Sequence, residues 1–511
     1  MREFYKKNKK AFFLAFVYTA LCFGFMLTHF VPHIDEETWL LNDNDSILWL
    51  LQNRYTVYLY NLFFTEHGRF VPFFATVAGI FFWNVSGFLF ANVFFDFEKK
   101  DRFWLRTLLL CYYSSIPFCM GEAFAFSMLM IPESFGMILV ALAFLLTVKP
   151  AAVTGNRLKS SLCALCSILF LAIALGAYQA LICIYVTAVA GWCLCRFLED
   201  KSFKPQLLLG ILFCTVSTGL YYIINLAVAK AFGTASYLSA NYVGWTNGEN
   251  ILFNLFMALA NVGRISFAIP FQGVYVYGGA TLRIITVLFL LFSIAVFFKK
   301  KGAAKKAGVI LFTLGILLAP FALYIALGTY KTQGRMMIAL PLAGMIELLL
   351  MFRFIQKPYV ERFFYIFLLA VLCVNASNMN RIYYHNYLVY QRDQSIAREI
   401  IHDLKRTGYD YHNKPVVFIG KVEQEDMGTS ASGTLGASFF EWDDGNIGRM
   451  ADFIKLEGCA LRKPSSEQIT AALTVRESMQ LWPLEDSIRE MQDYIVIYLS
   501  EPSDEWYRTN L

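Results

Sequence analysis

Long apolar blocks, separated by short polar stretches, recur along the chain as far as residue 379. A helix that crosses the hydrocarbon core of a bilayer needs about 20 mainly apolar residues, and most of these blocks approach that length. The pattern predicts an all-α polytopic membrane domain over residues 1–379 with about eleven transmembrane helices. We expect these helices at residues 11–32, 71–95, 104–120, 134–148, 160–176, 178–197, 206–230, 281–298, 307–328, 336–354 and 363–379.

The remaining residues, 380–511, are more polar and predict a small α/β domain. The segment "QSIAREIIHDLKRTG" has the spacing of an amphipathic helix that ends at Gly408, and "KPVVFIG" and "DYIVIYLS" are typical of buried strands. Ser465 and Gln468 have the spacing of a capping box at the start of another helix. The sequence contains no Rossmann glycine fingerprint, no Walker lysine loop and no zinc-ligand spacing.

Two connections between the apolar blocks are unusually long, namely residues 33–70 and residues 231–280. The first contains the aromatic segment "SILWLLQNRYTVYLYNLFF", which is interrupted by Gln52, Asn53 and Arg54. An apolar segment broken in this way is expected to lie along the membrane interface and not to cross it. A passive membrane anchor needs neither loop.

The distribution of Lys and Arg predicts the orientation in the membrane. The N-terminal "MREFYKKNKK" and the connections "FEKKDRFWLR" and "KKKGAAKK" alternate with connections that hold few basic residues. By the positive-inside rule, the basic connections face the cytoplasm of a bacterial inner membrane. The N-terminus is then cytoplasmic and retained as an anchor, whereas residues 33–70, residues 231–280 and the C-terminal domain lie outside.

Composition agrees with a membrane protein, because 57% of the residues are hydrophobic and only 16% are charged. A soluble protein carries about a quarter charged residues. The net charge of +6 does not indicate nucleic-acid binding, because the basic residues lie in short loops between apolar blocks. Of the eleven cysteines only Cys459 lies in the hydrophilic tail, which therefore cannot form an internal disulfide.

Three consecutive acids, Asp35, Glu36 and Glu37, follow the first apolar block. Carboxylates at the outer end of a membrane span can serve as general bases, and we expect Asp35 or Glu36 to be catalytic. The alternative is an acidic loop left outside by charge bias, but acidic residues weigh little in that bias. We expect no resident cofactor, although the acids leave a divalent cation open.

Basic residues in two outer connections are candidates for binding the phosphate of a lipid carrier. Arg69 lies beside His67 in "FTEHGRFVPFF", and Lys331 and Arg335 lie in "ALGTYKTQGRMMIALP". The guanidinium group suits phosphate, and basic residues on the outer side run against the positive-inside bias. A snorkelling arginine or a lipid headgroup contact is the alternative.

Polar residues within apolar surroundings are candidates for contact with a substrate. Tyr178 and Gln179 interrupt the block at 160–197, where a tight outer turn is the alternative explanation. Glu122 and Glu133 flank another short outer turn, and an acid so close to the membrane interior is costly unless it has a role. A structural ion pair between Glu122 and Arg69 is the alternative there.

In this order, these motifs resemble the polytopic glucosyltransferases that decorate bacterial surface polysaccharide, of the O-antigen serotype-converting type with a GT-C-like fold. The likeness covers nearly the whole chain, although each motif has only two to four residues. The residues that carry it are His33-Ile34-Asp35-Glu36, Gly68-Arg69, Tyr178-Gln179 and Gly334-Arg335, together with the C-terminal domain.

The resemblance implies a sugar donor carried on polyprenyl monophosphate, with glucose as the sugar. The acidic pair of such enzymes, often two aspartates, falls here on Asp35 and Glu36. The chain departs from the pattern after Glu122, where "AFAFSM" replaces an acid followed by an Arg and an Asp.

We therefore expect an inverting membrane glycosyltransferase that moves a sugar from polyprenyl phosphate to a surface glycan or glycolipid. Asp35 or Glu36 would be its base, and Arg69, Lys331 and Arg335 would contact the donor phosphate. Glu122, Tyr178, Gln179 and His67 would contact the substrate. A flippase or transporter of lipid-linked sugar, a non-catalytic scaffold of polysaccharide assembly, and a polymerase or ligase that uses lipid diphosphate are the alternatives.

Overall fold

The computed structural model describes residues 2–41, 46–66, 68–98, 102–148, 157–233, 243–246, 250–270, 275–328, 333–355, 357–423 and 434–511. These residues form two compact units. The first comprises Met1–Thr28 and Asp45–Arg381, and the second comprises His29–Asn44 and Ile382–Leu511. The residues around Asp35, which the sequence pattern groups with the membrane domain, therefore belong to the same unit as the C-terminal residues.

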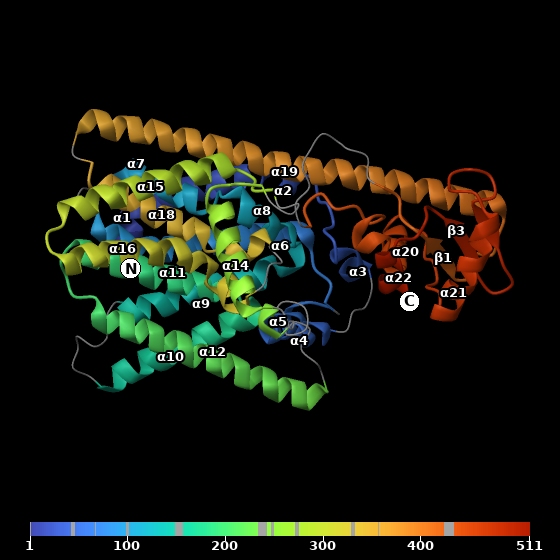
Figure 1. Cartoon of the computed structure of the whole chain (residues 1–511), viewed down its shortest axis with the longest axis horizontal. Coiled ribbons are helices and arrows are strands. Elements are labelled where there is room, and N and C mark those ends of the chain that lie inside the picture. Colours follow the sequence, from blue (N-terminus) through green and yellow to red (C-terminus); the bar gives the residue numbers. More distant parts are fainter. Residues whose placement is uncertain are drawn as a thin grey trace. The chain divides into compact units, whose positions relative to one another are not determined.

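The first unit is helical throughout its described residues (Figure 1). Its longer helices are α1 (Arg2–Cys22), α6 (Pro72–Phe94), α7 (Phe103–Tyr113), α9 (Met130–Val148), α10 (Arg157–Ala177), α11 (Leu181–Leu198), α12 (Lys204–Phe232), α14 (Ile251–Ser266), α15 (Gly279–Lys299), α16 (Ala303–Leu318), α18 (Leu340–Arg353) and the first part of α19 (Pro358–Thr407). Its shorter helices are α2 (Gly24–Thr28), α4 (Leu48–Leu51), α5 (Tyr55–Phe64), α8 (Pro117–Ala125) and α17 (Ala322–Leu327), with single 3-10 turns at η1 (Phe95–Phe97), η2 (Ser127–Leu129), η4 (Gly244–Thr246), η5 (Ala319–Phe321) and η6 (Gly334–Met337).

Nine helical segments in the described part of the chain are long and apolar enough to cross a membrane. A tenth is the pair α7 and α8, which is bent by 55° at residues 114–116. The bend falls just before Pro117, which cannot continue the hydrogen bonds of the preceding helix. The chain is thus a multi-pass membrane protein with a mostly helical fold, as the sequence predicts.

The count of candidate spans differs from the predicted eleven at the N-terminus. The apolar residues of the range 11–32 form the second half of α1 together with α2, which follows a break at Phe23. The first half of α1 carries Lys6, Lys7, Lys9 and Lys10, so α1 as a whole is too polar to qualify as a span. The other predicted ranges, apart from 104–120, each overlap one of the nine helical segments, with bounds that differ by up to several residues and by far more at the end of α19.

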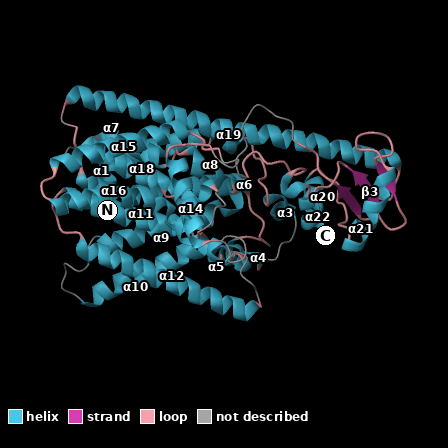
Figure 2. Ribbon diagram, viewed as in Figure 1, coloured by secondary structure: helices cyan, strands magenta, loops and turns pink. Residues whose placement is uncertain are grey.

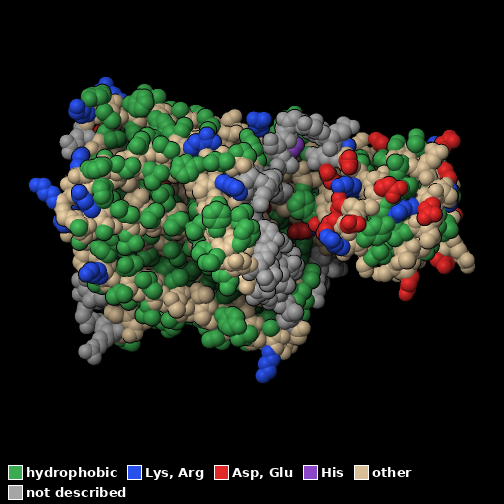
Figure 3. All heavy atoms as spheres, in the orientation of Figure 1, with side chains coloured by type: hydrophobic (Ala, Val, Ile, Leu, Met, Phe, Trp, Pro, Cys, Tyr) green, Lys and Arg blue, Asp and Glu red, His purple; other side chains and the backbone are tan. Residues whose placement is uncertain are grey.

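The helices of the first unit differ in how much of their surface faces outward. In the span that ends with α18, 94% of the apolar window is buried, whereas in α12 only 17% is buried. Hence α18 lies at the centre of the unit, in contact with α7, α11 and α15, while α12 lies at its edge. Figure 3 shows hydrophobic side chains over most of the visible surface of this unit, as expected of helices that face lipid.

The second unit contains a three-stranded sheet, shown in magenta in Figure 2. The strands β1 (Val416–Ile419), β2 (Ile488–Glu490) and β3 (Ile495–Tyr498) have the order β1-β3-β2, with β3 parallel to β1 and antiparallel to β2. Around it lie α3 (Glu36–Leu41), α20 (Ile447–Leu456), α21 (Ser466–Val475), α22 (Asp504–Asn510) and the 3-10 turns η7 (Trp442–Asp444) and η8 (Arg476–Ser478).

Local sequence signals set several of these elements. The capping box is present at the start of α21, where Ser465 and Gln468 exchange side-chain and backbone hydrogen bonds. Gly408 adopts a φ of 72° directly after α19, as expected of a residue that ends a helix. The strands expected from "KPVVFIG" and "DYIVIYLS" are β1 and β3, whereas the short β2 was not expected.

Candidate functional site

The sequence-predicted residues fall into two groups, one in each compact unit. The first group is the acidic turn, which we define as residues 33–37. It lies at the start of α3 in the second unit, and Ile34 is part of that unit's hydrophobic core. Burial of Ile34 removes its apolar side chain from water and so fixes the residues on either side of it.

The backbone of the acidic turn is held by a reciprocal pair of hydrogen bonds. The His33 N–H donates to Oε2 of Glu36 at 3.0 Å, and the Glu36 N–H donates to the His33 carbonyl at 2.8 Å. Between them, Asp35 adopts a φ of 81°, in a region that non-glycine residues seldom occupy. Such a conformation costs about 1–3 kcal/mol and persists only where the surrounding structure imposes it.

The three carboxylates of the acidic turn have different surroundings. The side chain of Asp35 is 55% exposed, whereas Glu36 is 0% and Glu37 2% exposed as residues. The Glu36 carboxylate accepts the His33 N–H and so has a part in forming the turn. Of the three groups, Asp35 is the one that a molecule in solvent can reach.

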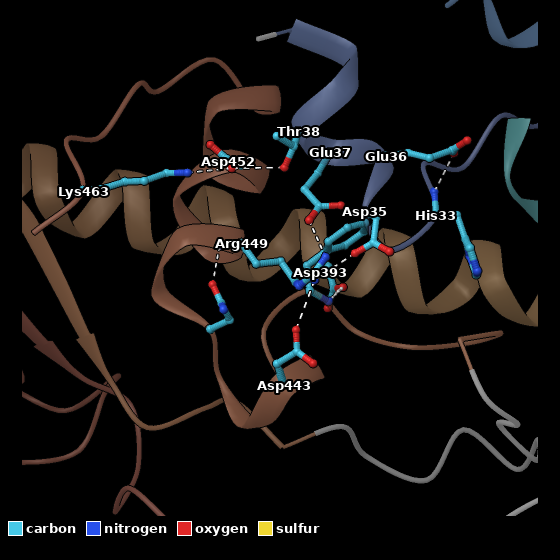
Figure 4. Close-up of polar contacts among 12 residues, drawn as sticks. His33, Asp35, Glu36, Glu37, Thr38, Asp393, Asp443, Arg449, Asp452 and Lys463 are labelled. Carbon is cyan, nitrogen blue, oxygen red and sulfur yellow. Dashed lines mark hydrogen bonds and ion pairs between the residues drawn. The ribbon is translucent and has the colours of Figure 1, made fainter. Parts of the chain in front are cut away.

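One arginine from α20 contacts Asp35 and Glu37, and it also contacts Asp443 (Figure 4). Nη2 of Arg449 donates to Oδ1 of Asp35 at 3.0 Å and to Oδ2 of Asp443 at 3.1 Å, and Nη1 donates to Oε1 of Glu37. The Arg449 side chain is only 12% exposed. Its planar guanidinium presents five N–H donors in fixed directions, so it can hold several carboxylates in a set geometry.

Glu37 is a buried titratable group of the acidic turn. Burial raises the pKa of Glu37 to about 7, against the opposing positive charge of Arg449. Asp35 and Asp452 raise the pKa of Glu37 further because their negative charges disfavour another anion nearby. The carboxyl of Glu37 therefore changes its protonation state within the physiological pH range.

Further polar contacts hold α3 and the acidic turn to the rest of the second unit. Thr38 Oγ1 donates to Oδ2 of Asp452 at 3.3 Å, and Lys463 donates to the same oxygen at 2.8 Å (Figure 4). His33 Nε2 lies 2.8 Å from Thr434 Oγ1. Contacts with both α20 and the segment before η7 thus fix the position of the turn.

The second group of predicted residues lies in the first unit, where η6 packs against α8. The Arg335 N–H donates to Oε2 of Glu122 at 3.1 Å, and the Arg335 guanidinium carbon lies 4.3 Å from the centre of the Phe126 ring. Glu122 is buried. A Cβ added to Gly334 would lie 2.3 Å from the Phe118 carbonyl oxygen, so only glycine allows η6 to approach α8 this closely.

Tyr178 lies close to the same charged residues. It interacts electrostatically with Arg335, Glu133, Arg54 and Glu122, although burial is the main cause that raises the pKa of its hydroxyl. The Arg54 guanidinium carbon lies 5.0 Å from the centre of the Tyr178 ring. The structure thus brings together three predicted residues, Arg335, Glu122 and Tyr178.

Arg54 and Glu133 complete this charged cluster; the sequence analysis considers Glu133 together with Glu122 but gives Arg54 no site role. Nη1 of Arg54 lies 3.2 Å from Oε1 of Glu133, and both side chains are largely buried. Arg335 also acts electrostatically on Glu133. The signal that could have identified Arg54 is the cost of an ionisable side chain in apolar surroundings, which predicts a partner for it.

Gln179 shapes the turn that presents Arg54. Its Nε2 donates to the carbonyl oxygens of Gln52 at 3.1 Å and Asn53 at 3.4 Å, and to the Tyr221 hydroxyl at 3.0 Å. These contacts hold the interruption in the aromatic segment of residues 46–64. The hydrogen bonds that the structure shows for the Gln179 amide nitrogen are thus all to groups of the protein itself.

Of the remaining predicted residues, the structure describes Arg69. Arg69 is exposed and follows Gly68, whose φ is 77°, and its N–H donates to the Glu66 carbonyl at 3.0 Å. His67 and Lys331 lie outside the described residues. Within the part of the chain that the structure describes, no three His, Cys, Asp or Glu side chains are arranged to hold a metal ion.

A family model described as Glucosyl transferase GtrII matches residues 24–352, which is more than half of the chain. The match includes both the acidic turn and the contact between Arg335 and Glu122. No curated protein and no solved structure matches the chain. The chain belongs to the glucosyl transferase GtrII family, in agreement with the resemblance that its sequence motifs carry.

Proposed function

We propose that this glucosyltransferase moves glucose from a polyprenyl-monophosphate carrier to a surface polysaccharide or glycolipid at the outer face of the bacterial cytoplasmic membrane. The observation that carries the proposal is the Asp35 carboxylate, which is exposed, held in a strained turn and contacted by Arg449, within a chain of glucosyltransferase family. Strained backbone that the surrounding structure imposes is often found at active sites.

In the proposed reaction, Asp35 takes the proton from an acceptor hydroxyl. The acceptor oxygen then bonds to the anomeric carbon of the sugar while the bond from that carbon to the phosphate oxygen breaks. The configuration at the anomeric carbon is inverted, the proton stays on Asp35, and the phosphate leaves with the lipid. Exposure favours Asp35 over Glu36, whose carboxylate is buried and accepts the His33 N–H.

Cationic side chains would stabilise the charge that develops on the leaving phosphate. Arg335 is our first candidate because Glu122 fixes its backbone and Phe126 supports its guanidinium. Arg69 and Lys331 are further candidates. Tyr178, Glu122, Gln179 and His67 are proposed to contact the sugar or to shape its pocket.

A lipid-borne donor is supported by the sequence, which has no nucleotide-binding fingerprint, and by the many candidate spans. The proposed orientation, with the acidic turn and the C-terminal residues outside, is supported by the basic connections that alternate along the chain. Because nucleotide sugars are cytoplasmic, an enzyme that works at the outer face needs a donor that the membrane itself delivers.

The test uses the purified full chain in detergent with radiolabelled polyprenyl-phosphate glucose and a crude surface glycan as acceptor. UDP-glucose is the comparison donor. We expect transfer from the lipid donor, loss of transfer in Asp35→Asn, and a smaller effect in Glu36→Gln, since the glutamine oxygen can still accept the His33 N–H. Transfer from UDP-glucose alone would refute the assignment of a lipid-linked donor. Full activity in Asp35→Asn would refute the assignment of Asp35 as the general base.

A further inference from the structure

The contact between Asp35 and Arg449 joins residues 414 positions apart in the chain, and Arg449 lies beyond the residues that the family model matches. Arg449 is the third residue of α20, and the side chain of the preceding Asn446 accepts the Arg449 N–H at 3.0 Å and so caps the helix. The cap fixes the first turn of α20 and therefore the backbone position from which the Arg449 side chain extends.

The three carboxylates around Arg449 differ in role, because two of them hold the guanidinium in place and the third, Asp35, is the one that it orients. Glu37 is 2% exposed and holds one arm of the guanidinium, while Asp443 holds the other arm from η7. Asp443 itself has a φ of 53°, which is unusual for a residue other than glycine. The guanidinium is thereby fixed on two sides, and Nη2 faces Asp35 in a set direction (Figure 4).

Fewer contacts hold the side chain of Asp35 than hold that of Arg449. Its side chain is half exposed, and among the described residues Arg449 is the one that forms a hydrogen bond with its carboxylate. Without that contact, the carboxylate could rotate among its rotamers, since an exposed aspartate has little else to order it. A general base that is displaced by about 1 Å can lose about 100-fold in rate.

We propose that Arg449 is a positioning residue that holds the Asp35 carboxylate in the direction required for proton abstraction, with Glu37 and Asp443 fixing the arginine in turn. This inference rests on the proposed function, in which Asp35 is the base. It gives the C-terminal unit a part in the reaction: a residue on α20 orients a carboxylate of the acidic turn.

The experiment measures glucose transfer by the full chain with Arg449→Met, Arg449→Lys and, as a matched control, Arg489→Met. Arg489 is also an arginine of the second unit with several partners, namely Asp486 and Ser478, but it does not contact the acidic turn. We expect Arg449→Met to lower kcat about 100-fold with little change in the KM for donor. Arg449→Lys should recover part of the loss, and Arg489→Met should behave as wild type.

A second measurement separates positioning from a general loss of structure. In an Asp35→Glu background the longer side chain has already moved the carboxylate, so adding Arg449→Met should cost less than about threefold in kcat. An equal loss in both backgrounds would overturn the proposal, and so would an Arg449→Met enzyme within about twofold of wild type. If Arg449→Met does not fold, Arg449→Lys decides, because wild-type kcat in that variant also overturns the proposal.

The experiments separate the role of Asp35 as the base from the positioning role of Arg449. If Asp35→Asn transfers glucose at the wild-type rate, the base assignment fails whatever Arg449 does. If Asp35→Asn is inactive while Arg449→Met and Arg449→Lys keep the wild-type kcat, the base stands and the positioning role of Arg449 is refuted.

Discussion

The backbone N–H of Arg335 donates to the buried carboxylate of Glu122 at 3.1 Å, across 213 residues of sequence. The contact fixes where the chain begins the turn η6 and hence where the Arg335 guanidinium can reach. Because a buried carboxylate without partners is costly, the pair also accounts for the presence of an acid on α8.

Replacing Gly334 with alanine should displace η6 from α8. The added Cβ would lie 2.3 Å from the Phe118 carbonyl oxygen, a backbone atom that cannot move aside. We expect a loss of about 1–3 kcal/mol in stability and a lower rate of glucose transfer. Thermal unfolding in detergent and the transfer assay test this. Gly315→Ala is the control, since nothing lies within 4 Å of its added Cβ, and equal behaviour of the two variants would contradict the prediction.

Glu122→Ala should weaken donor binding more than Glu122→Gln. Glutamine keeps an oxygen that can accept the Arg335 N–H, whereas alanine leaves this donor without its acceptor. Loss of such a partner costs about 1–3 kcal/mol, which, if it weakens donor binding by the same amount, corresponds to a rise of about 5-fold to 150-fold in the KM for the lipid donor. Steady-state kinetics with polyprenyl-phosphate glucose measure this KM for the two variants and for wild type. Equal KM values for the two variants would show that the hydrogen bond does not matter for the donor.

The pair Arg54 and Glu133 should behave as a coupled buried ion pair. Arg54→Met leaves the Glu133 carboxylate without the guanidinium 3.2 Å away, and breaking a buried pair typically costs about 3–5 kcal/mol. Adding Glu133→Gln should restore part of the lost stability, because no charge then remains unpaired. Apparent Tm values of the two single variants and the double variant form the cycle. Strictly additive losses would rule out the coupling.

Stability should depend on pH through Glu37, whose pKa burial raises from 4.5 to about 7. The folded chain then binds a proton that the unfolded chain has released, so the stability contributed by this group is present below about pH 4.5. It is lost as the pH rises to about 7, by a few kcal/mol at most. Arg449, Asp35 and Asp452 are the charged groups that face it.

Comparison of wild type with Glu37→Gln tests this dependence. The variant cannot ionise, so its apparent Tm relative to wild type should increase between about pH 5 and 7 and then level off. In the described part of the chain, Oε2 of Glu37 has no hydrogen-bond partner, which adds to the cost of the ionised form. Parallel curves of Tm against pH for the two proteins would contradict the assigned pKa.

The sequence by itself determined the features that depend on neighbouring residues. Nine predicted spans became helices because the length of an apolar block is a local property that the bilayer requires. The capping box of Ser465 and Gln468 formed because its residues lie within one helical turn. The short motifs around Asp35 and Arg335, taken in order, were enough to point to the glucosyltransferase family that the comparison confirms.

The tertiary structure decided the contacts between segments far apart in sequence. The sequence pattern does not indicate that residues 29–41 pack with the C-terminal unit, or that Arg449 contacts Asp35 across 414 positions. The pairing of Arg54 with Glu133 likewise spans 79 positions. Such contacts depend on how whole elements pack, and no local periodicity records which charged side chains that packing brings together.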